Sequence, residues 1–479
     1  MILWSKEKIK KALKDELIYI DENYNYKITN VVFDNRRING CSLFIAKKGE
    51  NNDGHNYIET TLKTCKDAII LANESYINTN SQFKNNSRII VVKDTIKSME
   101  KKAIYSRNIV KGIVIGITGS LGKTTTKDLA YSCLSNYGNT YCNIQSFNNY
   151  FGILTTLCNL PENIEYAIIE MGMSSVGEME KLSKIVQPNI SIITNIISAH
   201  SVFFKEEKDI AVEKSKIFKY QNKNGFTILN KSNKYFNLLE EEANKNDITK
   251  ILTFGENSNS NISLINYKED NEYYIAEYNL NNKKIEYEFS SPDYNICLNL
   301  MPIILLINEL NLDIYKIKDS LKNFSVSRGR NNIEYSNIDG KHITIINGTY
   351  NAVNPLTFIR GFELIDKISN KQKINRKIAI LGDIREADDN AENFMLSLKD
   401  YIIKSKIDLL ICIGDVIKVL YDSIKNEIDS KYFKTYKEVI PIIKNILHDN
   451  DLLFIKSSKG IKTYKILNEL VEEKMDVYE

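Results

Sequence analysis

The chain lacks the sequence features of several large classes of protein. It contains no run of roughly 18 apolar residues, and its N-terminal stretch alternates apolar and basic side chains without the apolar core of a signal peptide. Its seven cysteines are scattered and include no CxxC pair, so neither a disulfide framework nor a zinc site is indicated. The 64 basic and 61 acidic residues nearly balance, which argues against a nucleic-acid or anionic-membrane partner. These absences predict a cytoplasmic protein without a membrane span.

The composition is that of a globular protein with several domains. The chain has 479 residues, of which 43% are hydrophobic and 26% are charged. A length prior then suggests about three domains. Residues 1–105 contain short apolar runs separated by turns, which predict a small α/β domain. The predicted strands of this part are Thr29–Phe33, Ser42–Ala46, Ala68–Leu71 and Arg88–Val92.

The middle of the chain has the pattern of a doubly wound parallel sheet. Ile113–Ile117 is a continuous apolar run, as expected for a strand that is buried on both faces, and Lys123–Leu134 has a helical pattern. Tyr166–Glu170 and Ile190–Thr194 are further buried-strand candidates, each followed by a polar turn. Parallel strands place such turns at one edge of the sheet. We therefore predict a central domain over residues 106–328.

A second Rossmann-like unit is predicted over residues 329–479. Its short apolar strands end in polar or glycine-containing turns, and a polar stretch at Ser325–Asn332 is a plausible linker before it. The predicted strands are Lys377–Leu381, Leu409–Ile413 and Leu452–Ile455. The fold class that follows is α/β, with a small N-terminal domain, a central ATPase-like domain with a mainly parallel sheet, and a C-terminal Rossmann-like domain.

The strongest chemical signal is a glycine-containing turn between a predicted strand and a predicted helix. It reads Gly119, Ser120, Leu121, Gly122, Lys123, Thr124 and Thr125. Glycines let backbone N–H groups approach phosphates, Lys123 would reach the β- and γ-phosphates, and the Thr124 hydroxyl would bind Mg²⁺. The general motif has a glycine where this chain has Ile117. The alternative interpretation is a glycine-rich turn followed by an ordinary lysine at a helix start.

Three downstream residues are weaker candidates. Glu170 ends a predicted buried strand, where a carboxylate can hold Mg²⁺ directly or through water. The alternative is an acid at a strand end that faces solvent, and the nearby phosphate loop favours the metal role. His200 follows the next strand and could bind a second metal, orient a substrate phosphate or be purely structural. Spacing alone makes Lys214 a lysine on a helix surface. In the C-terminal unit, the turn Lys456–Gly460 is either an anion-binding turn or a pair of surface lysines at a helix start.

Together these pieces resemble the Mur ligase family. The stretch GITGSLGKTTTK at residues 116–127 is similar to that family's version of the phosphate loop, and the resemblance spans nearly the whole chain. It implies a UDP-sugar-binding N-terminal domain, a central ATPase and a C-terminal domain that brings in the amine substrate. Phe33–Arg37, Ser42–Ala46 and Asp53–His55 resemble the nucleotide-sugar motif of the N-terminal domain.

The central motifs resemble the members that add a dipeptide. Asn148–Gly152, Glu170–Gly172 and Gly177–Glu178 are of this type, as are Tyr350–Ala352 and Asn354–Pro355. The resemblance implies an ATP-dependent carboxylate–amine ligase that joins D-alanyl-D-alanine to UDP-N-acetylmuramoyl-tripeptide through an acyl phosphate, in peptidoglycan precursor synthesis. It implies ATP, two Mg²⁺ and a monomer. The alternatives are another amino-acid-adding ligase of the family, a non-catalytic relative that binds nucleotide-sugar, and a P-loop switch or motor.

The resemblance also implies roles for individual residues. Lys214 matches a lysine that is carbamylated by CO₂, which would make it a metal ligand beside Glu170, His200 and Thr124. Asn295 and Asn299 match adenine-side positions, and Arg330 matches a hinge arginine that reaches the ATP phosphates and joins Lys123, His200 and Lys214 in catalysis. The implied substrate-binding residues are Asp34, Arg36, Asp53, His55, Asn148, Asn149, Tyr350, Asn351, Lys456, Ser458 and Lys459.

The chain departs from the family pattern around the nucleotide and the hinge. Asn347-Gly348-Thr349 stands where two acids usually precede the Tyr350 motif, and Val353 is an apparent insertion. Tyr294 replaces a usual histidine, Asn35 replaces a usual serine, and Lys231-Ser232 lacks an expected acid. The Asn347-Gly348 change is the feature that favours a non-catalytic relative.

Overall fold

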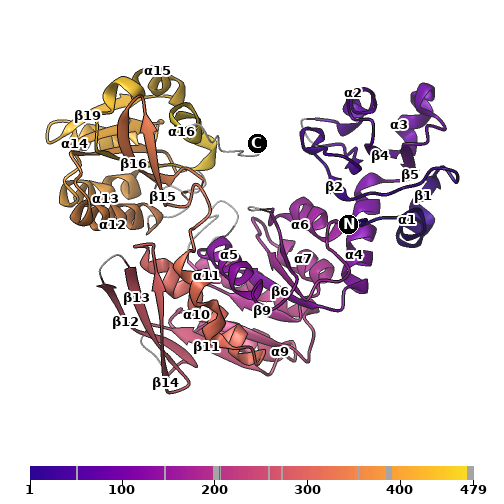
Figure 1. Cartoon of the computed structure of the whole chain (residues 1–479), viewed down its shortest axis with the longest axis horizontal. Helices are drawn as coiled ribbons and strands as arrows, with labels where there is room; N and C mark the ends of the chain where they lie inside the picture. Colours follow the sequence, from indigo (N-terminus) through magenta and orange to yellow (C-terminus); the bar gives the residue numbers. More distant parts are fainter. Residues whose placement is uncertain are drawn as a thin grey trace.

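The computed structural model describes residues 1–479 except 50–51, 145–146, 198–203, 205, 257–258, 271–272, 351, 353–355, 385–390 and 472–479. The described residues form three sheets, one after another along the chain. In Figure 1 the N-terminal part (indigo) and the C-terminal part (orange to yellow) lie on either side of the central part (magenta). Each sheet falls within one of the three stretches that the sequence predicts.

The N-terminal sheet has five strands in the order β1-β5-β4-β3-β2, and only β1 runs antiparallel to its neighbour. Its strands are β1 Leu17–Tyr19, β2 Asn30–Val32, β3 Ser42–Ile45, β4 Ile69–Asn73 and β5 Ile89–Val92. The helices of this part are α1 Lys6–Leu13, α2 Ile58–Thr64, α3 Glu74–Thr79 and α4 Thr95–Ile109. Helix α4 leads into the central part, where it packs beside α6 (Tyr150–Cys158).

The central sheet has nine strands in the order β14-β13-β12-β11-β10-β9-β6-β8-β7. The strands from β7 to β12 in this order are parallel, and β12, β13 and β14 form an antiparallel extension. The strands are β6 Ile113–Thr118, β7 Thr140–Cys142, β8 Tyr166–Glu170, β9 Ile190–Ile193, β10 Phe226–Asn230, β11 Ile251–Gly255, β12 Ile262–Asp270, β13 Tyr273–Leu280 and β14 Lys283–Phe289. The helices are α5 Lys123–Leu134, α6, α7 Glu178–Val186, α8 Glu207–Ser215, α9 Phe236–Lys245, α10 Tyr294–Glu309 and α11 Lys318–Lys322.

Strand β6 lies at the switch point of the central sheet. It pairs with β8 on one side and with β9 on the other, and all three strands are parallel. Their carboxyl ends therefore lie side by side, and the turns that follow them meet at one edge. These strands are buried almost throughout, which explains their continuous apolar sequences.

The C-terminal sheet has six strands in the order β15-β16-β20-β17-β18-β19, in which only β15 is antiparallel. Its strands are β15 Asn332–Ile338, β16 Lys341–Gly348, β17 Arg376–Gly382, β18 Leu409–Ile413, β19 Asp429–Phe433 and β20 Asp451–Lys456. Its helices are α12 Leu356–Lys371, α13 Ala391–Lys404, α14 Lys418–Ile424, α15 Tyr436–Ile446 and α16 Tyr464–Leu470. Apolar clusters fill both faces of this sheet.

The expected α/β fold with mainly parallel sheets is confirmed. One local expectation needs adjustment, because the turn after β20 opens a three-residue 3-10 helix at Lys459–Ile461 before α16 begins. All seven cysteines lie within the described ranges and are free thiols. No helix in the described part of the chain is both long enough and apolar enough to cross a membrane.

Candidate nucleotide and substrate site

The turn after β6 has the backbone of a phosphate loop. Gly119 and Gly122 have backbone φ angles of +148° and +85°, a region that residues other than glycine rarely adopt. A Cβ on Gly119 would lie 2.0 Å from Thr194 Oγ1, and one on Gly122 would lie 2.2 Å from Asn299 Oδ1. Only glycine fits at these two positions, so the loop can press against β9 and α10 while its N–H groups stay at the surface of the turn.

The end of β9 holds this loop in place. The Ser120 N–H donates to Asn195 O at 2.6 Å, and the Ser120 hydroxyl donates to Ile197 O at 2.8 Å. The Thr194 hydroxyl donates to Leu121 O at 2.6 Å. The loop is therefore fixed by hydrogen bonds before any ligand binds, which is the preorganisation that phosphate recognition requires.

Lys123 is the first residue of α5 and curls over the loop. Its ammonium donates to Gly119 O at 2.8 Å and to Ser120 O at 3.1 Å. Burial lowers the pKa of Lys123 to about 8; the Glu170 carboxylate opposes this shift and the Arg330 guanidinium adds to it. A cation held in so poorly solvated a place is stabilised by an incoming anion.

Thr124 and Glu170 form a buried pair beside the loop. The Thr124 hydroxyl donates to Glu170 Oε2 at 2.8 Å, and Asn148 Nδ2 donates to Glu170 Oε1 at 2.6 Å. Glu170 is fully buried, so it does not face solvent. A hydroxyl and a carboxylate at a phosphate loop are the hard oxygen donors that Mg²⁺ prefers, together with phosphate oxygens. These residues fit a magnesium ion, although the described residues contain no group of three or more His, Cys, Asp or Glu that could hold a metal.

Lys214 lies in the interior, although its spacing alone suggested a helix surface. It sits near the end of α8 with 2% of its surface exposed. Burial lowers its pKa well below the ordinary value, and the charge of Lys123 lowers it further, while Glu213 opposes the shift. The Lys214 amine is therefore close enough to Lys123 to be affected by its charge. His200 lies outside the described residues.

The nucleotide-side residues lie on α5 and α10. Asn299 Oδ1 accepts from the Thr126 hydroxyl at 3.3 Å, and Asn299 Nδ2 donates to Asn295 O at 2.7 Å. Asn295 in turn donates to Asp293, the N-cap of α10. Thr125 lies in the first turn of α5 and is partly buried. Asn295, Asn299 and Thr125 are therefore all close to the loop or one helical turn from it.

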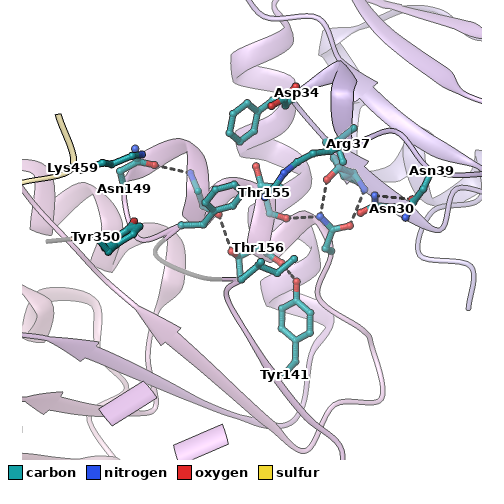
Figure 2. Close-up of a pocket in the computed structure, with 17 residues that line it drawn as sticks. Asn30, Asp34, Arg37, Asn39, Tyr141, Asn149, Thr155, Thr156, Tyr350 and Lys459 are labelled. Atoms are coloured by element: carbon teal, nitrogen blue, oxygen red, sulfur yellow. Dashed lines mark hydrogen bonds between the residues drawn. The ribbon is translucent and has the colours of Figure 1, made fainter. Parts of the chain in front are cut away.

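A cavity of about 670 Å³ opens beside this site between the three parts of the chain. Figure 2 shows Asn30, Asp34, Arg37 and Asn39 of the N-terminal part on one side and Asn149, Tyr350 and Lys459 on the other. Asn149 lines the cavity, while its neighbour Asn148 binds Glu170. The cavity therefore adjoins the Thr124–Glu170 pair through two consecutive asparagines.

The expected substrate-binding residues divide into two groups. Asp34, Asn149, Tyr350 and Lys459 line the cavity. Arg36 does not: its side chain is 71% exposed and pairs with Asp34 at 2.8 Å. Five further residues of the second group also lie away from the cavity lining: Asn148, Asp53, His55, Lys456 and Ser458. Asn351 lies outside the described residues.

Two members of that group have structural contacts. The buried His55 ring bonds Asp53 through Nδ1 at 2.7 Å and accepts the Asn73 N–H at Nε2 at 3.1 Å. Both ring nitrogens are therefore occupied, and Asp53 also accepts the His55 N–H as the cap of a 3-10 helix. The two residues shape the turn after β3 and β4 rather than the cavity wall.

The C-terminal turn brings cations to the same region. Lys456 is 2% exposed, and burial together with Arg330 and Arg360 lowers its pKa to about 7. Arg330 and Lys459 lie 5.0 Å and 6.0 Å from the Tyr350 ring centroid. The Ser458 hydroxyl donates to Ala352 O at 2.9 Å, which ties the turn to the segment after β16. This arrangement favours an anionic ligand.

Asn347, which stands in place of an expected acid, belongs to a buried network at the hinge. It donates to Glu334 Oε1 at 2.9 Å, and Asn332 donates to the same oxygen at 2.8 Å. Burial would raise the pKa of Glu334, but hydrogen bonds from Arg328, Asn347 and Asn332 outweigh it and lower the pKa. An acid at 347 would repel Glu334, so the amide suits this network.

Several residues that line the cavity are not among the substrate-binding residues expected from the sequence. Arg37 lines the cavity with its guanidinium 4.7 Å from the Phe147 ring centroid. Helix α6 adds a polar face of Thr155, Thr156 and Asn159, which recurs at helical spacing after Asn149. That polar spacing on an otherwise apolar helix was the available signal.

Comparison with known proteins gives one consistent result. The Mur ligase middle domain matches residues 117–306. A UDP-N-acetylmuramoyl-tripeptide–D-alanyl-D-alanine ligase of Rickettsia prowazekii is 30% identical over 98% of this chain and 99% of its own. A ligase of the same name from Bacillus subtilis is 27% identical, and the match covers 93% of each chain.

Solved structures agree on the fold. A crystal structure of MurF from Acinetobacter baumannii has a TM-score of 0.80 at 22% identity and covers 98% of this chain and 99% of its own. The MurF ligase from Thermotoga maritima in complex with ADP has a TM-score of 0.71 at 22% identity, covering 92% and 96%. The three-domain arrangement is therefore shared over nearly the whole chain.

Proposed function

The chain belongs to the Mur ligase family, and on that premise we propose that it joins D-alanyl-D-alanine to UDP-N-acetylmuramoyl-tripeptide with cleavage of ATP to ADP and phosphate. The relatives from Rickettsia and Bacillus carry this activity in their names. We place the reaction in the cytoplasmic synthesis of peptidoglycan precursors. We further propose a monomer as the working form.

One observation supports this function above the others. The phosphate loop, the Thr124–Glu170 pair and the cavity are joined by directly bonded residues, from Thr124 through Glu170 and Asn148 to Asn149. A nucleotide phosphate and a carboxylate substrate bound at these two places would be brought together, which is the main contribution that an enzyme can make to phosphoryl transfer.

The three parts of the chain would divide the task. We propose that residues 1–105 bind the UDP-sugar portion, that residues 106–328 bind ATP, and that residues 329–479 bring in the dipeptide. Asp34 and Arg37 lie on the N-terminal wall of the cavity, and Tyr350 and Lys459 lie on the C-terminal wall. Asn295 and Asn299 would lie on the adenine side.

The reaction would take place in two steps. An oxygen of the tripeptide carboxylate attacks the γ-phosphorus, the bond to the β-phosphate oxygen breaks, and ADP leaves with that electron pair. The dipeptide amine then attacks the acyl carbon, the bond to the phosphate oxygen breaks, and the amine loses a proton. Lys123 offsets negative charge on the phosphates, and Arg330 would do so from the hinge. Closure about Arg330 would exclude water from the acyl phosphate.

Thr124 and Glu170 would hold Mg²⁺. Bound magnesium supplies positive charge that neutralises the phosphates. We propose His200 and Lys214 as ligands of a second ion. Burial lowers the pKa of Lys214 well below its ordinary value and so favours the neutral amine, whose lone pair can add to CO₂. The product is a carbamate and a released proton, which turns a buried amine into an anionic oxygen ligand.

The amine specificity separates this proposal from another ligase of the same family. The purified enzyme is incubated with ATP, Mg²⁺ and UDP-N-acetylmuramoyl-tripeptide, and D-alanyl-D-alanine is compared with single amino acids. We expect a product only with the dipeptide. Equal product with a single amino acid would assign the chain to a different member of the family.

A further inference from the structure

Asn143 is a buried asparagine that lies directly after the edge strand β7. Strand β7 pairs with β8 only as far as Cys142 and Ile168, so the last two residues of β8 have no strand partner on that side. Glu170 is one of them. Its backbone would be left with unpaired polar groups in a fully buried position, which is costly unless another group supplies the bonds.

The Asn143 side chain supplies both missing bonds. The Glu170 N–H donates to Asn143 Oδ1 at 2.9 Å, and Asn143 Nδ2 donates to Glu170 O at 3.1 Å. A side-chain amide offers one acceptor and two donors, and here it stands in for the peptide group of an absent strand. The end of β8 is thereby held in place beyond the point where its pairing with β7 ends.

The same amide group connects to the rest of the site. Asn143 Nδ2 also donates to Phe147 O at 2.9 Å, immediately before Asn148, which binds the Glu170 carboxylate. On the other side, the Lys127 ammonium of α5 donates to Asn143 O at 3.1 Å. Asn143 therefore joins the phosphate-loop helix, the Glu170 backbone and the turn that carries Asn148 and Asn149.

We propose that Asn143 is a positioning residue that sets the orientation of the Glu170 carboxylate and so determines the affinity of the site for the divalent cation that accompanies the nucleotide. The inference rests on the proposed function, because it takes Glu170 to be the metal-binding carboxylate. Groups that orient a metal ligand typically change metal affinity by roughly 10–100-fold when they are removed.

The test measures Mn²⁺ binding to the full-length protein in the presence of ADP, by electron paramagnetic resonance of free Mn²⁺. Asn143→Ala removes all three hydrogen bonds. Asn143→Asp keeps the size and the acceptor for the Glu170 N–H, but it loses the donors and places an anion near Glu170. We expect both variants to bind Mn²⁺ roughly 10–100-fold more weakly than the unmodified protein.

A matched control is available in Asn189. Its Oδ1 accepts the Val114 N–H at 2.8 Å near the start of β6, whereas the phosphate loop follows the end of that strand. Asn189→Ala therefore removes the same kind of bond far from the site. This variant should keep the Mn²⁺ affinity. Lys127→Met gives a second route if Asn143→Ala does not fold, and it should weaken Mn²⁺ binding in the same direction by a smaller factor.

Steady-state kinetics give a second readout. The Mg²⁺ concentration for half-maximal activity should rise in Asn143→Asp, while the KM for the dipeptide stays unchanged. Mn²⁺ affinity within a factor of about two of the unmodified protein in folded Asn143→Asp would overturn the inference. If the unmodified protein binds no Mn²⁺ with ADP, the proposed function itself fails, and the two outcomes are thereby separated.

Discussion

The Thr124 hydroxyl donates a hydrogen bond of 2.8 Å to the Glu170 carboxylate across 46 positions of sequence. The two residues come from the start of α5 and the end of β8, which meet because β6 and β8 are adjacent parallel strands. Both side chains are buried beside the phosphate loop. The pair explains how one edge of the central sheet can hold a nucleotide and its metal ion together.

Replacing the carboxylate of this pair should weaken metal binding while leaving the fold intact. Glu170→Gln keeps the size of the side chain and can still accept from Thr124, so the fold should be retained. We expect turnover to fall by at least about 100-fold, beyond the range typical for groups that only orient a metal ligand. Phosphate release at saturating ATP measures it, and turnover within a factor of about three of the unmodified enzyme would remove Glu170 from the metal site.

The carbamate on Lys214 can be tested directly. Lys214→Ala should be nearly inactive, because it removes the anionic ligand that the modified lysine would supply. Short-chain carboxylic acids should restore part of the activity by occupying the vacated space. A ¹³C signal in the carbamate region should also appear when the unmodified protein is equilibrated with ¹³CO₂. Full activity of Lys214→Ala without any added acid would exclude the role.

Nucleotide affinity should depend on pH through Lys123. The pKa of about 8 in the free protein means that the lysine loses its charge above that pH. A bound phosphate requires the cation, and the terminal phosphate itself, with a pKa of about 6, is already ionised there. The dissociation constant for ADP should therefore rise from pH 7.5 to 9.5, approaching tenfold per pH unit at the upper end.

The control for this prediction is Lys123→Arg, whose side chain stays charged over the same range. Its ADP affinity should be nearly independent of pH, whatever its absolute value. A flat profile for the unmodified protein, measured by isothermal titration calorimetry, would contradict the inferred protonation state of Lys123.

The sequence-based expectation and the structure differ on which of two neighbouring arginines contacts the substrate: the expectation names Arg36, and the structure favours Arg37. Arg37 lines the cavity, whereas Arg36 is exposed and bound to Asp34. We expect Arg37→Ala to raise the KM for UDP-N-acetylmuramoyl-tripeptide by roughly 10–100-fold, the worth of one hydrogen bond to a charged group. Arg36→Ala should raise it much less, and ADP affinity should stay the same in both. The opposite order of the two KM values would place the substrate elsewhere.

The buried Lys102 should make the stability of the protein rise with pH above neutrality. It is fully buried, its ammonium lies 3.8 Å from the Trp4 ring centroid, and burial lowers its pKa from 10.5 to about 7. Between these values the unfolded chain carries a proton that the folded chain lacks, so stability rises with pH across this window. Lys102→Met removes that cost and should stabilise the protein by about 3 kcal/mol at pH 8 and by less than about 1 kcal/mol at pH 10.

Urea unfolding at the two pH values checks this prediction. The neighbouring Lys101 is the matched control, because it is partly exposed and pairs with Asp15 at 2.8 Å. Lys101→Met should change stability by less than about 1 kcal/mol. A gain from Lys102→Met that is the same at pH 8 and pH 10 would show that the lysine does not titrate in this range.

Much of the fold follows from the sequence alone. Continuous apolar runs correctly located β6, β8, β9, β17, β18 and β20, and the helical pattern located α5, because strands buried on both faces leave an unmistakable signal. The antiparallel extension β12–β14 was not predicted. Its strands are partly exposed and alternate polar with apolar residues, as in β14, so they lack that signal.

The site was predictable only where a local pattern carries the chemistry. The turn Gly119–Thr125 is such a pattern, and Glu170 could be proposed because it ends a buried strand. The burial of Lys214 and the contact of Arg37 with the cavity depend on packing between distant elements. No spacing rule distinguishes Arg36 from Arg37, because adjacent residues after a strand point in different directions.

The most direct measurement is phosphate release from ATP by the purified enzyme, with each substrate omitted in turn. The phosphate loop, its metal-binding pair and the adjoining cavity predict release only when ATP, Mg²⁺, UDP-N-acetylmuramoyl-tripeptide and D-alanyl-D-alanine are all present, with an amide product formed in equal amount. Steady release that is indifferent to either the tripeptide or the dipeptide, or no release with the complete mixture, would contradict the assignment.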